Sequence, residues 1–253
     1  MDDIDSSNET EVLIISPGHS SYSSINSNTK KEEDNSALTL DEAIEMTGVG
    51  RFHAWLLLVL AWVHCADALG YTSMSYVMPP ASCELDATDL DLSLITTMGL
   101  VGMLVGSYVC GTLADTHGRL PALVLCQACN GLFTVGSAAS QSLWVLTLTK
   151  ALSGFGLGGS TCVIFTYAIE FLPMKNRGRY IISVTAGFSA GLLIVAGLAW
   201  LIIPHEEWSW STGGFTFNSW RLFLLITGVP PITSVPLLLT LPESPRYLVK
   251  AGS

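Results

Sequence analysis

Three ionisable side chains stand inside long apolar stretches, where a charge is rare and costly. Asp67 lies among apolar residues, His64 precedes it by about one helical turn, and Lys150 separates two charge-free segments. An ionisable group at membrane depth costs at least about 2.5–3.5 kcal/mol on insertion scales, so it usually faces a bundle interior or water. Asp67 is a candidate proton relay or cation-binding carboxylate. The alternative is a structural ion pair, for which Lys150 is the candidate partner, and His64 could simply bond a backbone carbonyl.

Three short polar motifs each combine an acid, an arginine and a chain-bending glycine or proline. They occupy residues 111–119 (GTLADTHGR), 170–179 (EFLPMKNRGR) and 242–246 (PESPR). Ion pairs of this kind can hold one end of a helix bundle closed and release when helices move, and arginine can bind carboxylates bidentately. The residues expected to form this cytosolic gate are Gly111, Asp115, Gly118, Arg119, Glu170, Arg177, Arg179, Glu243 and Arg246.

Glycines spaced four residues apart recur in three of the apolar stretches. The pairs are Gly102 and Gly106, Gly154 and Gly158, and Gly187 and Gly191. This spacing lets a neighbouring helix backbone approach closely in a membrane. The run at 154–159 (GFGLGG) also fits a dinucleotide fingerprint, but no strand precedes it and no αβ alternation surrounds it. The seams therefore predict tight helix packing, either static or at surfaces that slide.

Other chemistry finds little support in the sequence. Cys126 and Cys129 have the spacing of half a zinc site, but no second pair accompanies them, and buried thiols usually pack as small apolar groups. No nucleophile–base pair or cofactor motif is evident, so we predict neither an enzyme, a metal site nor a cofactor. The chain also lacks the basic surface that nucleic acid requires.

The elements that position these residues are membrane-spanning helices. Charged residues make up only 13% of the 253 residues, and several stretches carry no charge at all, such as 92–114 and 120–149. A helix needs roughly 20 mostly apolar residues to cross about 30 Å of hydrocarbon. The predicted spans are Trp55–Val77, Ser93–Leu113, Pro121–Ser140, Leu143–Ile169, Tyr180–Ile203 and Trp220–Leu241. Together they make residues 53–253 an all-α six-helix bundle.

The N-terminal part has a different composition. Eleven of the 21 acidic residues lie before residue 46, so the net charge of −10 belongs mostly to this part. Residues 1–36 are too polar to bury a core, which predicts a disordered acidic tail. Residues 37–52 fit a short amphipathic helix along the membrane, with Asp41 as its cap.

Orientation follows from the distribution of basic residues between the two sides. With six spans, one side of the membrane would carry Arg51, Arg119, Lys175, Arg177, Arg179, Arg246 and Lys250. The opposite side would carry Arg221 alone. Basic residues in short loops favour the cytosolic side, so both termini are predicted to be cytosolic.

The three polar motifs, in this order and spacing, resemble those of the major facilitator superfamily. A closer resemblance is to the synaptic vesicle glycoprotein 2 family and its relatives. It rests on residues 40–52 (LDEAIEMTGVGRF), 152–159 (LSGFGLGG), 202–209 (IIPHEEWS), 219–221 (SWR) and 242–248 (PESPRYL). The resemblance covers the chain from about Leu40 onward. It implies a fold of twelve spans in two six-helix halves, with alternating access around a central site and an acid near Asp67. This chain would supply the N-terminal half, and the second half would be missing.

The sequence departs from the family pattern at three positions. Thr116 and Leu120 stand where the family loop usually has basic residues, and Lys150 stands where span four usually begins with arginine. Lysine is a point charge without the planar fork of arginine, so a bidentate contact is not available at that position.

These observations predict a secondary transporter that moves a small organic solute by alternating access, coupled to protons or ions. The alternative is a transport-inactive protein of the same fold that acts in binding or trafficking on vesicle membranes. Either would be a multi-pass protein of the plasma membrane or an intracellular vesicle. Its expected partners are the lipid bilayer, a small organic solute, and a second half or another copy.

Overall fold

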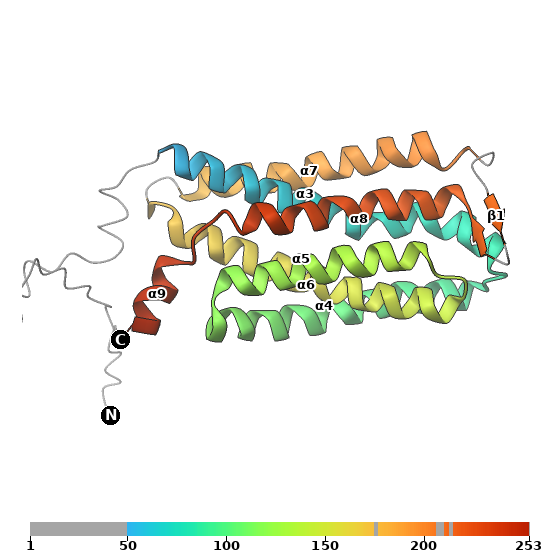
Figure 1. Cartoon of the computed structure of the whole chain (residues 1–253), viewed down its shortest axis with the longest axis horizontal. Helices are drawn as coiled ribbons and strands as arrows, with labels where there is room; N and C mark the ends of the chain where they lie inside the picture. The colour runs from blue at the N-terminus through green and yellow to red at the C-terminus, as the bar shows by residue number, and fades with distance from the viewer. Residues whose placement is uncertain (1–49, 175–176, 206–209, 213–214, 253) are drawn as a thin grey trace, which may run out of the picture.

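A computed structural model describes residues 50–174, 177–205, 210–212 and 215–252 (Figure 1). The predicted acidic tail and nearly all of the predicted amphipathic segment lie outside the described residues. The elements, in chain order, are α3 (Arg51–Glu84), α4 (Asp89–His117), α5 (Arg119–Ala138), α6 (Leu143–Phe171), α7 (Arg177–Ile202), β1 (Trp210–Thr212), β2 (Phe215–Phe217), α8 (Ser219–Leu238) and α9 (Pro245–Gly252).

Within this described part, six helices are long and apolar enough to cross a membrane, and they coincide with the six predicted spans. Most predicted ends agree to within four residues. The exception is α3, which continues seven residues beyond Val77 to Glu84. Hydropathy marks where apolar residues stop, whereas the helix continues until its backbone hydrogen bonds end. The start of α4 is fixed by a capping box, in which Thr88 and Asp91 each accept the other's backbone N–H.

The long helices run side by side, with α9 beyond one end of the bundle and the β1–β2 hairpin at the other (Figure 1). We call these the α9 end and the hairpin end. Helix α4 packs against α6, α5 packs against α6 and α8, and α3 packs against α7 and α8. Helices α4 and α7 bury the least of their surface within the bundle.

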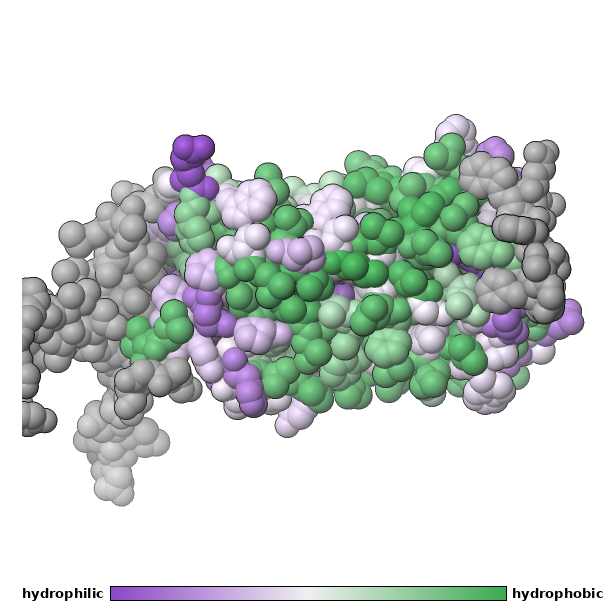
Figure 2. Space-filling view, in the orientation of Figure 1, coloured by the Kyte–Doolittle hydropathy of each residue, from purple (hydrophilic) through white to green (hydrophobic). Residues whose placement is uncertain are grey.

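Apolar side chains cover most of the visible flank of the bundle, and hydrophilic residues gather toward its two ends (Figure 2). The exposed apolar residues include Leu104, Leu193 and Trp200, each of which is more than 70% exposed. A soluble monomer rarely exposes an apolar surface of this extent. The surface fits a lipid environment, in which apolar side chains face outward.

The buried apolar core of the described residues includes two clusters. One, near the α9 end, includes Leu56, Leu60 and Val63 of α3. The other, near the hairpin end, includes Leu69 of α3 and Phe223 of α8. Along α3, the buried polar residues His64 and Asp67 lie where the first cluster, whose last α3 residue is Val63, meets the second, whose first is Cys65. The sequence thus places its candidate charge where the apolar core is interrupted.

Candidate functional site

The carboxylate of Asp67 lies inside the bundle and is held by two other helices. Asp67 is 1% exposed. Its Oδ1 accepts a hydrogen bond from Nε2 of Gln127 on α5 at 2.8 Å, and its Oδ2 accepts one from Oγ of Ser160 on α6 at 2.8 Å. Gln127 Nε2 also donates to Ser160 Oγ at 2.7 Å. We call these three residues the Asp67 site.

The Asp67 site has one spare acceptor. Oε1 of Gln127 is buried and has no hydrogen-bond partner among the described residues. A carboxylate only accepts hydrogen bonds, whereas a protonated carboxyl also donates one. If the Gln127 amide turned over, Oε1 could accept the proton of a neutral Asp67. The same pair of side chains can therefore satisfy both protonation states.

His64 lies next to this site without a direct hydrogen bond to it. Its Nδ1 is 3.9 Å from Oδ2 of Asp67, which is too long for a hydrogen bond. The ring packs against Phe165 at 5.2 Å and Phe188 at 5.0 Å between centroids. A small displacement would bring the imidazole into contact with the carboxylate.

Lys150 does not form the ion pair with Asp67 that was one alternative from the sequence. It is 5% exposed, and its Nζ has no hydrogen-bond partner in the part of the chain that the structure describes. The carboxylate of Asp67 instead takes its hydrogen bonds from uncharged donors, Gln127 and Ser160. Lys150 lines a cavity between α3, α4 and α6.

The six predicted packing glycines all lie at close helix crossings. A Cβ at Gly102, Gly106 or Gly158 would collide with a backbone carbonyl across the α4–α6 contact, and one at Gly154 would collide with the carbonyl of Gly99. At Gly187 and Gly191 the obstacle is a carbonyl of α3. The run at 154–159 is part of helix α6, so it forms no phosphate-binding turn.

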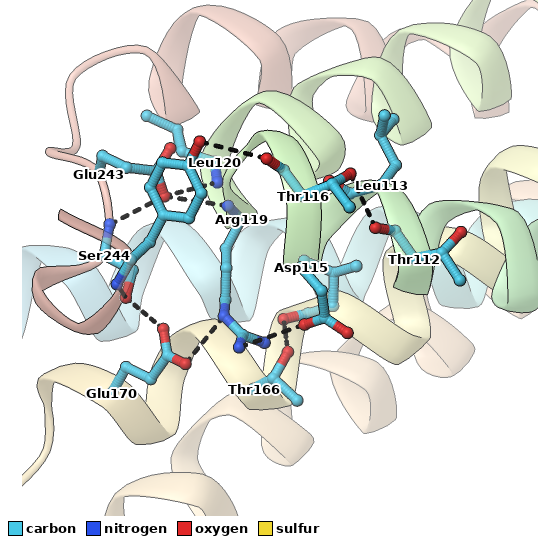
Figure 3. Close-up of polar contacts among 12 residues, drawn as sticks. Thr112, Leu113, Asp115, Thr116, Arg119, Leu120, Thr166, Glu170, Glu243 and Ser244 are labelled. Carbon is cyan, nitrogen blue, oxygen red and sulfur yellow. Dashed lines mark hydrogen bonds and ion pairs between the residues drawn. The ribbon is translucent and has the colours of Figure 1, made fainter. Parts of the chain in front are cut away.

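Four of the predicted gate residues meet at the α9 end (Figure 3). Nε of Arg119 is 2.8 Å from Oε1 of Glu170, and its NH2 is 3.4 Å from Oδ1 of Asp115. Glu170 also accepts a short hydrogen bond from the hydroxyl of Ser244, which follows Glu243. These five residues form what we call the Arg119 cluster, and it joins α4, α5 and α6 to the segment after α8.

Glu243 caps the start of α5 from a distant part of the sequence. Its Oε1 accepts the backbone N–H groups of Arg119 at 3.0 Å and Leu120 at 3.2 Å, as well as that of Ser244. A carboxylate at a helix N-terminus satisfies unpaired N–H groups and the helix dipole together. The preceding Gly118 has φ +103°, in the region that favours glycine, and a Cβ there would lie 2.8 Å from Oε2 of Glu243.

The other predicted gate residues lie around this cluster. Arg177 donates to the carbonyl of Leu172 at 3.4 Å. Arg179 is exposed at the start of α7, whereas Arg246 on α9 lies near enough to interact electrostatically with Glu170. A Cβ at Gly111 would make an ordinary contact with Cys162.

The hairpin end holds an ion pair that the sequence did not point to. Arg221 of α8 is fully buried, and its NH2 is 2.9 Å from Oε1 of Glu84, the last residue of α3. Its NH1 donates to the carbonyl of Ser140, and its guanidinium lies 4.4 Å from the ring centre of Trp220. The pair therefore ties α3 to α8 and to the end of α5.

Reasoning from charge alone missed the uncharged partners of Asp67. Gln127 and Ser160 carry no charge, and they lie 60 and 93 positions away in the sequence. One signal was available, because Gln127, Asn130 and Thr134 follow the spacing of one helix face. Asn130 and Thr134 both bond Ser153 of α6, which extends the polar contact between α5 and α6.

Comparison with known proteins identifies a family and similar curated proteins. The family described as "Sugar (and other) transporter" matches residues 22–253. Synaptic vesicle glycoprotein 2C of Rattus norvegicus is 32% identical over 256 residues, covering 98% of this chain and 35% of that protein. Synaptic vesicle glycoprotein 2A of Homo sapiens is 32% identical over 224 residues, covering 88% and 30%. The chain thus spans about a third of the length of these curated relatives.

Solved structures share the fold. The proton:xylose symporter XylE of the major facilitator superfamily aligns with a TM-score of 0.71 at 18% identity, over 79% of this chain and 47% of that chain. A bacterial homologue of the human lysosomal transporter Spinster aligns with a TM-score of 0.69 at 21% identity, over 79% and 45%. The six helices therefore have the arrangement of one half of such a transporter.

Proposed function

Because this chain belongs to the sugar (and other) transporter family of the major facilitator superfamily, we propose that it carries a small organic solute across a membrane by alternating access, coupled to protons at Asp67. The observation that carries the proposal is the geometry of the Asp67 site. A carboxylate inside a membrane span is energetically costly, and ionisable residues at such positions usually have a function. A solved structure with this fold is a proton:xylose symporter by its description.

The Asp67 site has the chemistry that proton coupling needs. Deprotonated, Asp67 is stabilised by the donors Gln127 Nε2 and Ser160 Oγ. Protonated, it loses its charge and can donate to Gln127 Oε1 after the amide turns over. His64, whose Nδ1 is 3.9 Å from Oδ2 of Asp67, is an ionisable side chain that could pass a proton to or from the carboxylate. The donors come from α5 and α6, so a change in protonation alters contacts between three helices.

The Arg119 cluster supplies a switch for the other part of the cycle. It holds α4, α5 and α6 together at the α9 end, which the basic residues there suggest is the cytosolic end. An isolated exposed ion pair contributes only about 0–1 kcal/mol. A network in which Arg119 meets two acids, and one of these also bonds Ser244, can bias a two-state equilibrium more strongly.

The experiment that tests transport is a flux assay in liposomes that contain the purified chain assembled with its expected partner, a second half or another copy, with a panel of radiolabelled sugars and small organic acids. We expect saturable uptake of at least one solute, driven by an inwardly directed proton gradient. Empty liposomes are the first control. The variant Asp89→Asn, which neutralises an exposed acid at the hairpin end, is the second and should transport normally.

A second candidate function is a binding or trafficking role on vesicle membranes without flux. The 2A and 2C relatives are called synaptic vesicle glycoproteins, and these names support this second candidate. This candidate predicts that solutes or partners bind to the chain while no solute crosses the bilayer under any gradient. Binding with no flux across the whole panel would therefore support it over transport.

A further inference from the structure

A cavity of about 400 Å³ lies between α3, α4 and α6, in the half of the bundle toward the hairpin end. It exists because α3 and α4 both pack against α6 but barely contact each other. Its volume falls within the range of about 300–1,000 Å³ that is typical of small-molecule sites. We call it the Lys150 cavity.

Lys150 is the only charged residue among the described residues that line this cavity. It is 5% exposed, and its Nζ has no hydrogen-bond partner in the described structure. The nearby hydroxyl of Ser153 is already engaged with Asn130 and Thr134. A buried ammonium without a partner is costly, because the desolvated charge is not compensated. A bound anion would compensate the charge of this ammonium.

The rest of the wall is suited to an apolar body. Met74 and Met78 of α3 and Met103 of α4 line the cavity. Methionine side chains are flexible and polarisable, so they adapt to ligands of different shape. Tyr71 and Ser75 also line it, and within the described residues their hydroxyls form no hydrogen bond, which leaves polar contacts available beside the apolar ones.

We propose that the Lys150 cavity binds a small organic anion, with a carboxylate on the Lys150 ammonium and an apolar body against the methionines. This inference deepens the proposed transport function, since it names the substrate class, and its role as a transport site rests on that function. The anion site is separate from the proton site, because Asp67 is not among the cavity-lining residues. A cation would be repelled by Lys150, and an uncharged sugar could accept hydrogen bonds but would leave the buried charge of the ammonium uncompensated.

The test uses three fluorinated probes that share one ring and differ in charge: 4-fluorobenzoate, 4-fluorobenzamide and 4-fluorobenzylamine. Binding to the purified chain in lipid nanodiscs is measured by fluorine NMR. We expect the benzoate to bind at least about tenfold more tightly than the amide or the amine, since hydrogen bonds to charged groups are the strong ones. Equal affinity for benzoate and benzamide, or no benzoate binding at all, would overturn the proposal.

Variants locate the site. Lys150→Met keeps the unbranched apolar stem of the side chain and removes the ammonium group, and it should weaken benzoate binding about tenfold or more. Lys150→Arg keeps the charge and should retain most of the binding. Unchanged benzoate affinity in Lys150→Met would overturn the assignment of Lys150 as the anion partner.

Gly99 offers a test that leaves Lys150 intact. It lines the cavity, and a Cβ there would meet no atom within 4 Å, so Gly99→Leu should fold and fill the space. The matched control is Gly197→Leu on α7, where a Cβ also meets nothing within 4 Å. We expect loss of benzoate binding only in Gly99→Leu, with the elution volume of both variants unchanged. Benzoate binding that survives in a folded Gly99→Leu protein would place the site elsewhere.

Failure of this inference and failure of the proposed transport function give different results. Benzoate binding that depends on Lys150, without flux of any solute, supports the anion site and removes transport. Proton-driven uptake of a neutral solute by a protein that binds no benzoate supports transport and removes the anion site.

Discussion

The Arg119 cluster makes a quantitative prediction about the coupling between Arg119 and Glu170. The two charges approach to 2.8 Å between Nε and Oε1, with side-chain exposures of 22% and 8%. At an effective dielectric constant of about 20, unit charges 4 Å apart attract by about 4 kcal/mol. Desolvation of a partly buried pair offsets much of this attraction. We therefore expect a coupling free energy of about 1–2 kcal/mol. Exposed ion pairs typically give a smaller coupling, of roughly 0.2–1 kcal/mol.

The assay is a double-mutant cycle on the free energy of unfolding, measured by detergent titration of the wild type, Arg119→Gln, Glu170→Gln and the double variant. A parallel cycle pairs Glu170→Gln with Arg179→Gln, because Arg179 is exposed and has the same charge. The control cycle should be additive within about 0.3–0.5 kcal/mol. A coupling in the Arg119 cycle that is no larger than in the control cycle would refute the reasoning.

Three further predictions follow from local geometry. Gly118→Ala should lower stability by about 1–2 kcal/mol, because φ of +103° strains any other residue, whereas Gly136→Ala, with open space around it, should be neutral or stabilising in thermal unfolding. Arg221→Met should destabilise the protein by about 1.5–3 kcal/mol in the same measurement, since Glu84 loses a charged hydrogen-bond donor and keeps those of Asn218 and Trp220. In intact cells, and with the exposed Cys83 replaced by serine in both variants, a cysteine at Asp86 should react with an impermeant thiol reagent and one at Arg179 should not, and the opposite pattern would reverse the proposed orientation.

The six membrane helices could be predicted from the sequence because their signal is local. A charge-free stretch of about 20 residues has few alternatives in a helical membrane protein. The end of α3 was less predictable, because residues 78–84 remain helical although they are no longer strongly apolar. The glycine seams could be predicted for a related reason, since spacing along one helix determines which residues share a face.

The partners of each functional side chain could not be predicted in the same way. Glu243 caps α5 from 124 positions away, and nothing near Arg119 in the sequence indicates that a carboxylate will lie there. Charge counting suggested that Asp67 and Lys150 could neutralise each other, yet the structure satisfies Asp67 with Gln127 and Ser160 and leaves Nζ of Lys150 without a hydrogen-bond partner among the described residues. Which of two compatible partners a charge selects depends on how helices cross, and that is a tertiary property.

The central claim is that Asp67 couples solute movement to protons. The most direct test compares proton-driven accumulation of solute with the exchange of internal for external solute. Liposomes that contain the wild type, with an inward proton gradient and no other gradient, should accumulate solute above its external concentration. Asp67→Asn should abolish this accumulation but retain exchange of internal for external solute, because the path remains while the titrating group is gone. If Asp67→Asn liposomes still accumulate solute to the wild-type level under the proton gradient, Asp67 is not the coupling site.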